Sequence, residues 1–356
     1  MIEILSFIVV LGALIFVHEL GHFAVAKWVG IRVEQFSLGF PPKLYGFKWG
    51  ETEYRICWIP LGGYVKMSGD RPEVAAISGA PYEFMSKKPW QRTLVILAGP
   101  AMNYLLALVV LIGIYFYQGE PVVDNDHAII GAVMEDSPAE KVGLREKDVI
   151  LLVDDSTVTD FVSLSQYVSQ RPAQSIHLTW RRGGDTLQAT VTTWADSVLN
   201  LQGEMEVVGR IGARQNFTYK PLSISRAIVA GFRLTNFYGG MILKTIRDVI
   251  TGSVSTKMLG GPIFIAQVVG QAARQGLVSV LLLAAIISVN LAVINLVPIP
   301  VLDGGQLLFL VMEKIKGSPV SIKTRALMQQ VGVFLLIALT IFIVRNDISR
   351  IMEFGW

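Results

Sequence analysis

Two histidines separated by three residues, with a glutamate directly after the first, form the most chemically informative pattern in this chain. The pattern reads His18-Glu19-Leu20-Gly21-His22. In a helix, residues four apart share one face, so both imidazoles can bind one metal ion. Zinc hydrolases use this HExxH pattern to hold zinc and to supply a general base. It predicts His18 and His22 as metal ligands and Glu19 as the base.

The surroundings of this motif are unusual for a metal site. Residues 4–17 before it and 23–26 after it are almost wholly apolar. Ionisable residues at bilayer depth are costly and rare, so three of them at ligand spacing indicate a function. A cleaved signal peptide is an alternative for residues 1–26, but the only early charge is Glu3 and the run is long enough to span a membrane. We expect a retained helix.

The composition indicates an integral membrane protein. The 356 residues are 52% hydrophobic and 17% charged, below the usual quarter or so of charged residues. Four stretches could span a membrane, at roughly 4–26, 93–117, 277–297 and 327–345. The net charge of +3 comes without a dense basic patch, so we expect no nucleic-acid partner. The single cysteine, Cys57, excludes an intramolecular disulfide and a cysteine-based zinc site.

Basic residues predict the orientation of these spans. Lysines and arginines are frequent in residues 27–92 and recur in 314–325, so both segments should be cytoplasmic. Both termini and residues 118–276 would then lie outside the cytoplasm. Arg345 and Arg350, near the C-terminus, oppose this orientation.

An inserted domain is predicted at about 121–195. Strands are expected at 129–133 and 148–153, with a hairpin over 176–191, and helices at 137–144 and 164–168. Ser137 and Pro138 are suited to begin the first helix. The order of elements resembles a PDZ domain, which binds extended peptides by adding a strand to its sheet. Farther on, apolar residues at helical spacing in 221–276 predict amphipathic helices at the membrane surface, or alternatively ordinary packed helices.

A catalytic zinc usually has a third protein ligand besides water. Asp303 is the candidate, because Pro298 and Pro300 end the third span and leave irregular backbone before it. Irregular backbone at membrane depth is tolerated where it is buried or lines a wet cavity. An interfacial aspartate after a spanning helix is the alternative. The HExxH motif in the same chain favours the ligand.

Together these motifs resemble the site-2 protease family of intramembrane zinc metalloproteases, and within it the bacterial regulator-of-sigma-E group. The matching segments are residues 18–22 (HELGH), 60–65 (PLGGYV), 99–103 (GPAMN), 259–263 (LGGPI), 298–305 (PIPVLDGG) and 313–317 (EKIKG). They span nearly the whole chain. Enterobacterial members carry two tandem PDZ domains, whereas this chain has room for one, which places any gating scheme that needs two in doubt.

The resemblance implies a set of site residues. One zinc ion per chain would be held by His18, His22 and Asp303, with Glu19 as general base. Asn295, with Pro298 nearby, would hold the substrate main chain or the oxyanion. Gly99 and Asn103 would serve structurally, because small residues at this spacing let the second helix approach the first.

The resemblance also implies a substrate class and a location. The enzyme would cleave the transmembrane segment of a single-pass protein, such as an anti-sigma factor after a first external cut, and also signal-peptide remnants. Residues 32–66 would form a membrane-reentrant β-loop that clamps the substrate as an added strand; the alternative is a cytoplasmic loop without substrate contact. The PDZ-like domain would filter substrates by size or bind a peptide remnant. The location would be the bacterial cytoplasmic (inner) membrane.

The expected fold is therefore a polytopic α-helical membrane protein with four transmembrane helices, a membrane-associated β-loop and an inserted extracytoplasmic PDZ-like α+β domain. Its expected parts are residues 1–117 (first helix, β-loop, second helix), 118–210 (PDZ-like domain), 211–276 (amphipathic juxtamembrane helices) and 277–356 (third helix with the LDG motif, cytoplasmic loop, fourth helix).

Two other functions fit parts of this pattern. A membrane-anchored PDZ adaptor with an inactive zinc site is opposed by the complete set of His18, Glu19, His22 and Asp303. A metal transporter is opposed by the lack of further carboxylates or histidines in the four spans that could relay an ion.

The predicted orientation can be tested with a tag. We expect a tag inserted within residues 118–220 to react with a membrane-impermeant label added outside the cytoplasmic membrane. The reason is that the basic segments 27–92 and 314–325 should lie in the cytoplasm, which places residues 118–220 on the opposite side of the membrane. Labelling that requires access from the cytoplasmic side would contradict this topology.

Overall fold

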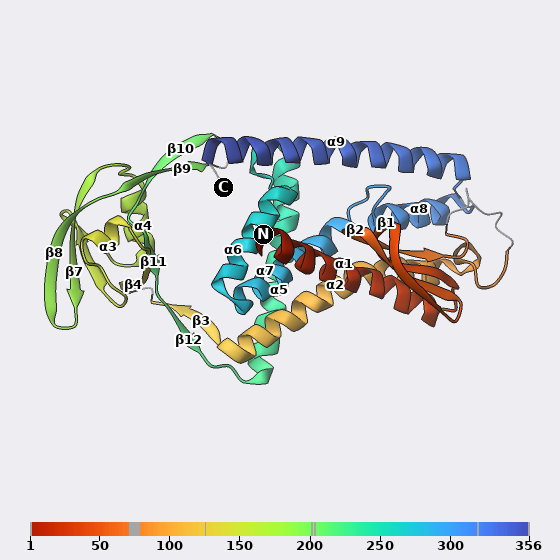
Figure 1. The fold of residues 1–356 in the computed structure, drawn as a ribbon, viewed down its shortest axis with the longest axis horizontal. Helices are drawn as coiled ribbons and strands as arrows, with labels where there is room; N and C mark the ends of the chain where they lie inside the picture. Colours follow the sequence, from red (N-terminus) through yellow and green to blue (C-terminus); the bar gives the residue numbers. More distant parts are fainter. Residues whose placement is uncertain are drawn as a thin grey trace. The chain divides into compact units, whose positions relative to one another are not determined.

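Long apolar helices dominate the fold. The computed structural model describes residues 2–70, 79–124, 126–200, 202, 204–318 and 320–354. Among these residues, four helices are long and apolar enough to cross a membrane. They are α1 (Ile2–Trp28), α2 (Pro89–Gln118), α7 (Leu277–Asn295) and α9 (Ile322–Phe354). The prediction of four segments that could span a membrane is therefore confirmed by the length and composition of these helices (Figure 1).

The chain divides into two units. One comprises the chain up to Ile114, residues Ile228–Arg247 and the chain from Leu259 onward. The other comprises Tyr115–Ala227 and Asp248–Met258. We call them the membrane unit and the inserted unit, and each is described by itself.

In the membrane unit, α1 and α2 approach each other closely. A methyl group added at Gly21 of α1 would lie 2.3 Å from the Ala98 carbonyl oxygen of α2, so only glycine fits there. An apolar core is shared by α1, α2 and the residues that follow α1. The 3-10 helix η1 (Phe84–Ser86) and helix α8 (Asp303–Lys316) also contribute to it. It consists of Ala26, Ile31, Val33, Phe84, Val95, Ile96 and Leu310.

A second core joins α2 and α7. Ala107 and Leu111 of α2 are buried against Ala285 and Val289 of α7. Helix α5 (Ile224–Ile250) adds Leu234, Tyr238 and Ile242, spaced four apart, to this cluster. Other apolar residues of α5, including Val229, Phe237 and Leu243, are exposed. One face of α5 is thus packed against α2 and α7, and other apolar residues of the helix are exposed.

Residues 32–66, the segment expected to form a β-loop, belong to a long bent hairpin. Strands β1 (Val33–Trp49) and β2 (Thr52–Met67) pair antiparallel. Residues 35–38 pair on one side with 53–56 and on the other with 63–66, because β2 folds back across β1. Among the described strands, none pairs with the outer side of residues 63–66. This segment, which we call the inner edge, lies beside α1, with which β2 is in contact, and its Val65 N–H group bonds to Glu19 of α1.

The inserted unit is built on one antiparallel sheet. Its strands lie in the order β11 (Ala213–Gln215), β4 (Ala128–Val133), β5 (Val149–Val153), β7 (Ser175–Arg182) and β8 (Asp185–Thr192), and β6 (Ser156–Thr157) pairs with β5. Helices α3 (Pro138–Lys141) and α4 (Phe161–Ser169) complete a core around Ile130, Ile150, Leu164 and Leu178. Ser137 caps α3, as predicted.

Strands that the sequence did not predict follow this core. Strands β9 (Trp194–Leu199) and β10 (Met205–Arg210) form a two-stranded ribbon, and β12 (Phe217–Lys220) pairs with β3 (Glu120–Val123). Residues 213–220 lie within 211–276, the segment expected to form amphipathic helices, but they form β11 and β12 instead. Strand β11 was missed because three residues that pair with a distant strand carry no alternating pattern of their own.

Helix α6 (Pro262–Gln275) follows the 3-10 helix η2 (Thr256–Met258) in the chain. In the membrane unit, α6 contacts both α1 and α9. It packs along α1, and its Arg274 is ion-paired with Glu3. At its N-terminus, the buried Asp347 of α9 accepts hydrogen bonds from the N–H groups of Gly261 (2.9 Å), Ile263 (3.0 Å) and Phe264 (3.1 Å). Because the first N–H groups of a helix lack intrahelical acceptors, this carboxylate caps α6 from another helix.

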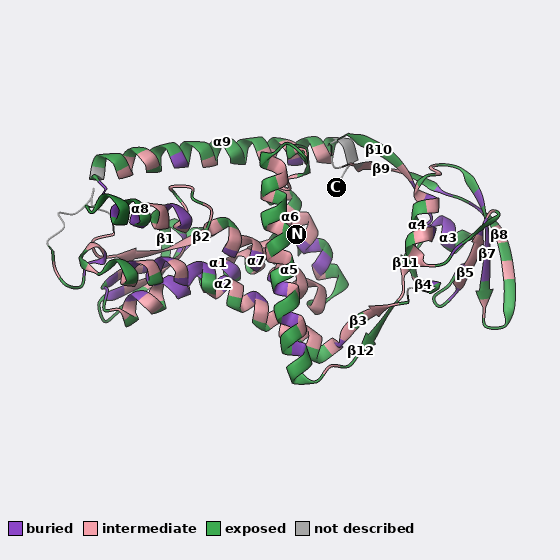
Figure 2. Cartoon of the chain, turned by 180° about the vertical axis from the view of Figure 1, so that it is seen from behind, coloured by how far each residue is buried: buried purple, intermediate pink, exposed green. Residues whose placement is uncertain are grey.

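Helix α9 is otherwise little buried. In the most apolar stretch of this helix only 6% of the residues are buried, and exposed residues cover most of its length in Figure 2. The Asp347 cap is therefore one of few attachments of this helix within the membrane unit.

The Asp347→Ala variant should loosen this attachment. An unsatisfied buried N–H group costs about 1–3 kcal/mol, and the substitution leaves three without their acceptor. We expect a lower thermal unfolding midpoint in detergent and faster hydrogen exchange at Gly261, Ile263 and Phe264. The exposed Asp155→Ala is the matched control. Exchange rates equal to those of the control would contradict the capping role.

Candidate metal centre

Three candidate ligands converge within the membrane unit. His18 and His22 lie one turn apart on α1, and Asp303 is the first residue of α8. The Oδ2 atom of Asp303 lies 3.2 Å from Nε2 of His18 and 3.5 Å from Nε2 of His22. The two Nε2 atoms are 3.2 Å apart. The structure thus brings together three residues that the sequence separates widely.

This cluster has the donor set and spacing of a zinc site. Ligand atoms about 2.0–2.2 Å from a tetrahedral zinc ion lie roughly 3.3 Å from one another, close to the distances found here. Asp303 Oδ2 is buried and accepts no hydrogen bond from the described residues, although both imidazole nitrogens are near it. Two imidazole nitrogens and a carboxylate oxygen without a hydrogen-bond partner, gathered at one point, fit a shared cation.

Helix α2 orients the second histidine. The Nδ1 atom of His22 lies 2.8 Å from the Val95 carbonyl oxygen, so Nδ1 carries the proton and donates it. The Nε2 atom is then left with its lone pair for a metal, as in most histidine ligands. One turn later, a methyl group at Gly99 would lie 2.3 Å from His22 Nε2 and 2.8 Å from His18 Cε1. Any side chain at Gly99 would enter the space where the imidazoles meet.

Asp303 is positioned by a tight turn between α7 and α8. Helix α7 ends at Asn295, and a helix begins again at Asp303. A methyl group at Gly304 would lie 2.3 Å from the carbonyl oxygens of Leu296 and Val297, and one at Gly305 would lie 2.2 Å from that of Ile299. The two glycines therefore let the first turn of α8 pack on the preceding turn, which holds Asp303 at the centre.

The remaining predicted residues lie around this centre. Asn295 places its Nδ2 atom 3.5 Å from His18 Nε2, and Pro298 lies in the turn between α7 and α8. Asn103 was expected to help pack the second helix against the first. Its main-chain oxygen accepts a hydrogen bond from Ser288 of α7 at 2.7 Å, which is a contact with a different helix. Its side chain also reaches the first histidine, with Nδ2 at 3.3 Å from His18 Nδ1.

Glu19 faces the β-hairpin. A methyl group at Gly63 would lie 3.1 Å from Glu19 Cγ and 2.9 Å from the Ser37 carbonyl oxygen. The inner edge of the hairpin, residues 63–66, therefore runs directly past the candidate base. A glycine is required there because the strand and the helix are in contact.

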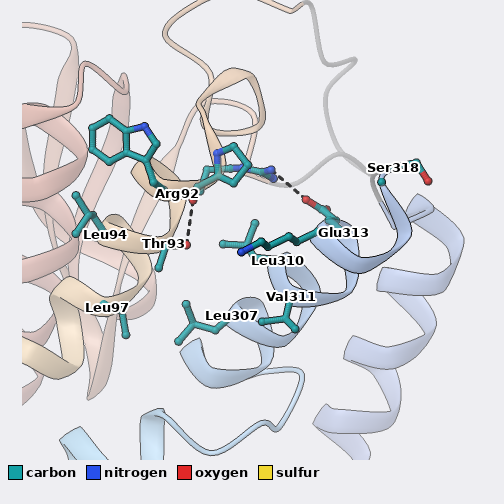
Figure 3. A pocket seen from close by; sticks show the side chains of 13 residues that line it. Arg92, Thr93, Leu94, Leu97, Leu307, Leu310, Val311, Glu313 and Ser318 are labelled. Atoms are coloured by element: carbon teal, nitrogen blue, oxygen red, sulfur yellow. Dashed lines mark hydrogen bonds and ion pairs between the residues drawn. The ribbon is translucent and has the colours of Figure 1, made fainter.

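A cavity of about 1060 Å³ lies beside α2 and α8 (Figure 3). Its lining residues fall within 89–97 and 307–318, so the candidate ligands are not among them. Its wall includes Arg92, whose Nη2 atom is 3.0 Å from Oε2 of the buried Glu313. Arg325 of α9 is ion-paired with the other carboxylate oxygen of Glu313. This buried ion cluster joins α2, α8 and α9. In the sequence, residues 313–317 stand out only as a motif, since nothing local indicates that Glu313 is paired with residues so distant.

Comparison with known proteins identifies a matching family and several relatives that align over nearly the whole chain. Residues 6–339 match the model of peptidase family M50. A putative zinc metalloprotease of Agrobacterium fabrum is 33% identical, covering 98% of this chain and 96% of its own. Zinc metalloprotease RasP of Oceanobacillus iheyensis is 28% identical, covering 99% of this chain and all of its own. The regulator of sigma-W protease RasP of Bacillus subtilis is 29% identical, covering 98% of both chains.

Among solved structures, the PDZ domain of an SdrC-like protein from Listeria monocytogenes aligns with 26% of this chain and 92% of its own. The sequence identity is 19% and the TM-score is 0.21.

The ion cluster offers a test of how α8 is held. In the Glu313→Ala variant, Arg92 and Arg325 lose their counter-charge while they remain buried. Removing one partner of a buried ion pair costs about 3–5 kcal/mol, so we expect a clearly lower thermal unfolding midpoint in detergent. Glu146→Ala, which removes an exposed glutamate, should leave the midpoint unchanged. Equal midpoints for the two variants would show that the cluster does not hold α8.

Proposed function

The chain belongs to peptidase family M50 and is a zinc metalloprotease, and from this premise we propose that it cleaves peptide bonds within the membrane. The observation that carries the proposal is the position of the candidate centre. His18, Glu19 and His22 lie on a helix long and apolar enough to span a bilayer, and Asp303 meets them there. A bond cut at this centre would lie at membrane depth, so the substrate would be a transmembrane segment.

Each residue has a proposed role. His18, His22 and Asp303 would hold one zinc ion, which when bound supplies Lewis-acid polarisation of the scissile carbonyl and activation of water. Glu19 would take a proton from water and pass it to the leaving amine nitrogen. Asn295, beside His18, would hold the substrate main chain or the oxyanion, with Pro298 shaping the turn next to it. Gly99 would keep the space between the imidazoles open.

The inner edge of the β-hairpin suggests how a substrate is presented. A transmembrane helix hides its amides in hydrogen bonds between successive turns, so it must unwind before cleavage. An unwound segment could add as a strand to residues 63–66, which lie next to Glu19. Main-chain pairing of this kind tolerates many side chains. The proposed β-clamp thus rests on an open edge in contact with the proposed base.

The physiological setting follows from the relatives and the charge pattern. The printed name of one relative, regulator of sigma-W protease, supports an anti-sigma factor as a substrate class here, cut after a first external cleavage. Signal-peptide remnants are further candidates. The inserted unit would be a PDZ-like filter or peptide sensor outside the bacterial cytoplasmic membrane, on the same side as both termini.

The Glu19→Gln variant separates metal binding from catalysis. It removes the proposed base and leaves the three proposed ligands, so we expect zinc to be retained. Cleavage of a reconstituted transmembrane substrate should fall by about 10²–10⁴-fold or more, the range of a general acid–base contribution.

The His22→Ala variant is the matched comparison, and it should lose both zinc and cleavage. A Glu19→Gln protein that cuts the substrate at the wild-type rate would overturn the proposed mechanism. Zinc retained at full occupancy by His22→Ala would overturn the proposed site.

A further inference from the structure

The side chain of Asn103 has an unusual hydrogen-bonding situation. It is fully buried on α2, with its Nδ2 atom 3.3 Å from Nδ1 of His18. Its Oδ1 atom is also buried and has no hydrogen-bond partner among the described residues. Because nothing else among the described residues bonds to this amide side chain, its contact with His18 is what decides its orientation.

The amide orientation decides which nitrogen of His18 carries the proton. If Nδ2 faces the ring, its N–H group donates to Nδ1, and the proton of a neutral imidazole must sit on Nε2. Nε2, however, lies 3.2 Å from both His22 Nε2 and Asp303 Oδ2, at the point where the candidate ligands converge. A proton there would occupy the lone pair that a metal needs.

Turning the amide by 180° removes this conflict. The oxygen and nitrogen of an asparagine amide have nearly the same shape, and the hydrogen-bond network decides between them. After the turn, Oδ1 faces Nδ1 across the same distance and accepts its proton. His18 then has the tautomer that His22 obtains from the Val95 carbonyl oxygen, with Nε2 free.

The spacing along α2 supports this assignment. Val95, Gly99 and Asn103 are each four residues apart, so they line one face of α2. Val95 contacts one imidazole, Gly99 leaves room for both, and Asn103 contacts the other. This arrangement gives the GxxxN segment a role toward the metal centre besides helix packing.

We propose that Asn103 is a positioning residue of the metal centre, whose side-chain carbonyl accepts the Nδ1–H of His18 and so fixes the metal-binding tautomer. The proposal rests on the proposed assignment of His18 as a zinc ligand. It does not depend on the substrate or on the β-clamp. Its measurable consequence is the affinity for zinc, because an orienting partner of a histidine ligand typically contributes 10–100-fold in metal affinity.

The test is a chelator competition on the purified full-length protein in detergent. Asn103→Leu keeps the approximate volume and removes the acceptor, and we expect its zinc affinity to fall by about 10–100-fold. Asn103→Asp keeps an acceptor at the same place, and its affinity should remain near that of the wild type. Ser288→Ala removes the bond to the Asn103 main-chain oxygen only, so it should bind zinc like the wild type.

The outcomes separate this inference from the proposed function. If His18→Ala keeps its zinc, the proposed site itself is wrong. If His18→Ala loses zinc and Asn103→Leu binds it as tightly as the wild type, only the positioning role is wrong. Equal losses in Asn103→Leu and Asn103→Asp would show that packing, and not an acceptor, matters. Should Asn103→Leu fail to fold, Asn103→Ala takes its place in the same comparison.

Discussion

The proposed metal centre depends on the fixed position of α2 against α1. Helix α1 carries two of the candidate ligands, but it carries none of the groups that orient them. Those groups belong to α2, where the Val95 carbonyl oxygen and the Asn103 side chain lie at opposite ends of the contact and Gly99 lies between them. Gly21 permits the approach from the other side. A shift of even part of a turn would bring α2 backbone into the imidazoles.

The same helix is also paired with α8, which carries Asp303, the third candidate ligand. Arg92, near the start of α2, is paired with Glu313 in the last part of α8, while Asp303 lies at the start of α8. Burying charges is costly, so such a cluster contributes geometry more than net stability. It ties the far end of α8 to α2, and the two glycines after Asp303 tie the near end to the turn before it. Helix α2 therefore contacts the two histidines directly and is joined to the far end of the helix that carries Asp303.

Local patterns in the sequence predicted the candidate ligands and the base of this centre. The contacts between residues far apart in the chain could not be predicted and are seen only in the structure. HExxH indicates two ligands and a base because the spacing within one helix fixes their common face. Asp303 has no such spacing, and it was identified through the prolines before it and a family resemblance. The Arg92–Glu313 pair and the Asp347 cap join residues too distant for any periodicity to relate them. The inner edge of the hairpin was also out of reach, because it depends on how β2 folds back across β1.

The wide separation of the candidate ligands has a consequence for biosynthesis. His18 and Asp303 lie near opposite ends of the chain, and a ribosome completes the first of them long before the second. At roughly 5–20 residues per second, tens of seconds pass between the synthesis of α1 and that of α8. During this interval the nascent chain holds the HExxH helix without Asp303, the candidate carboxylate ligand. An enzyme assembled in this order would remain inactive toward neighbouring membrane proteins until its own insertion is nearly complete.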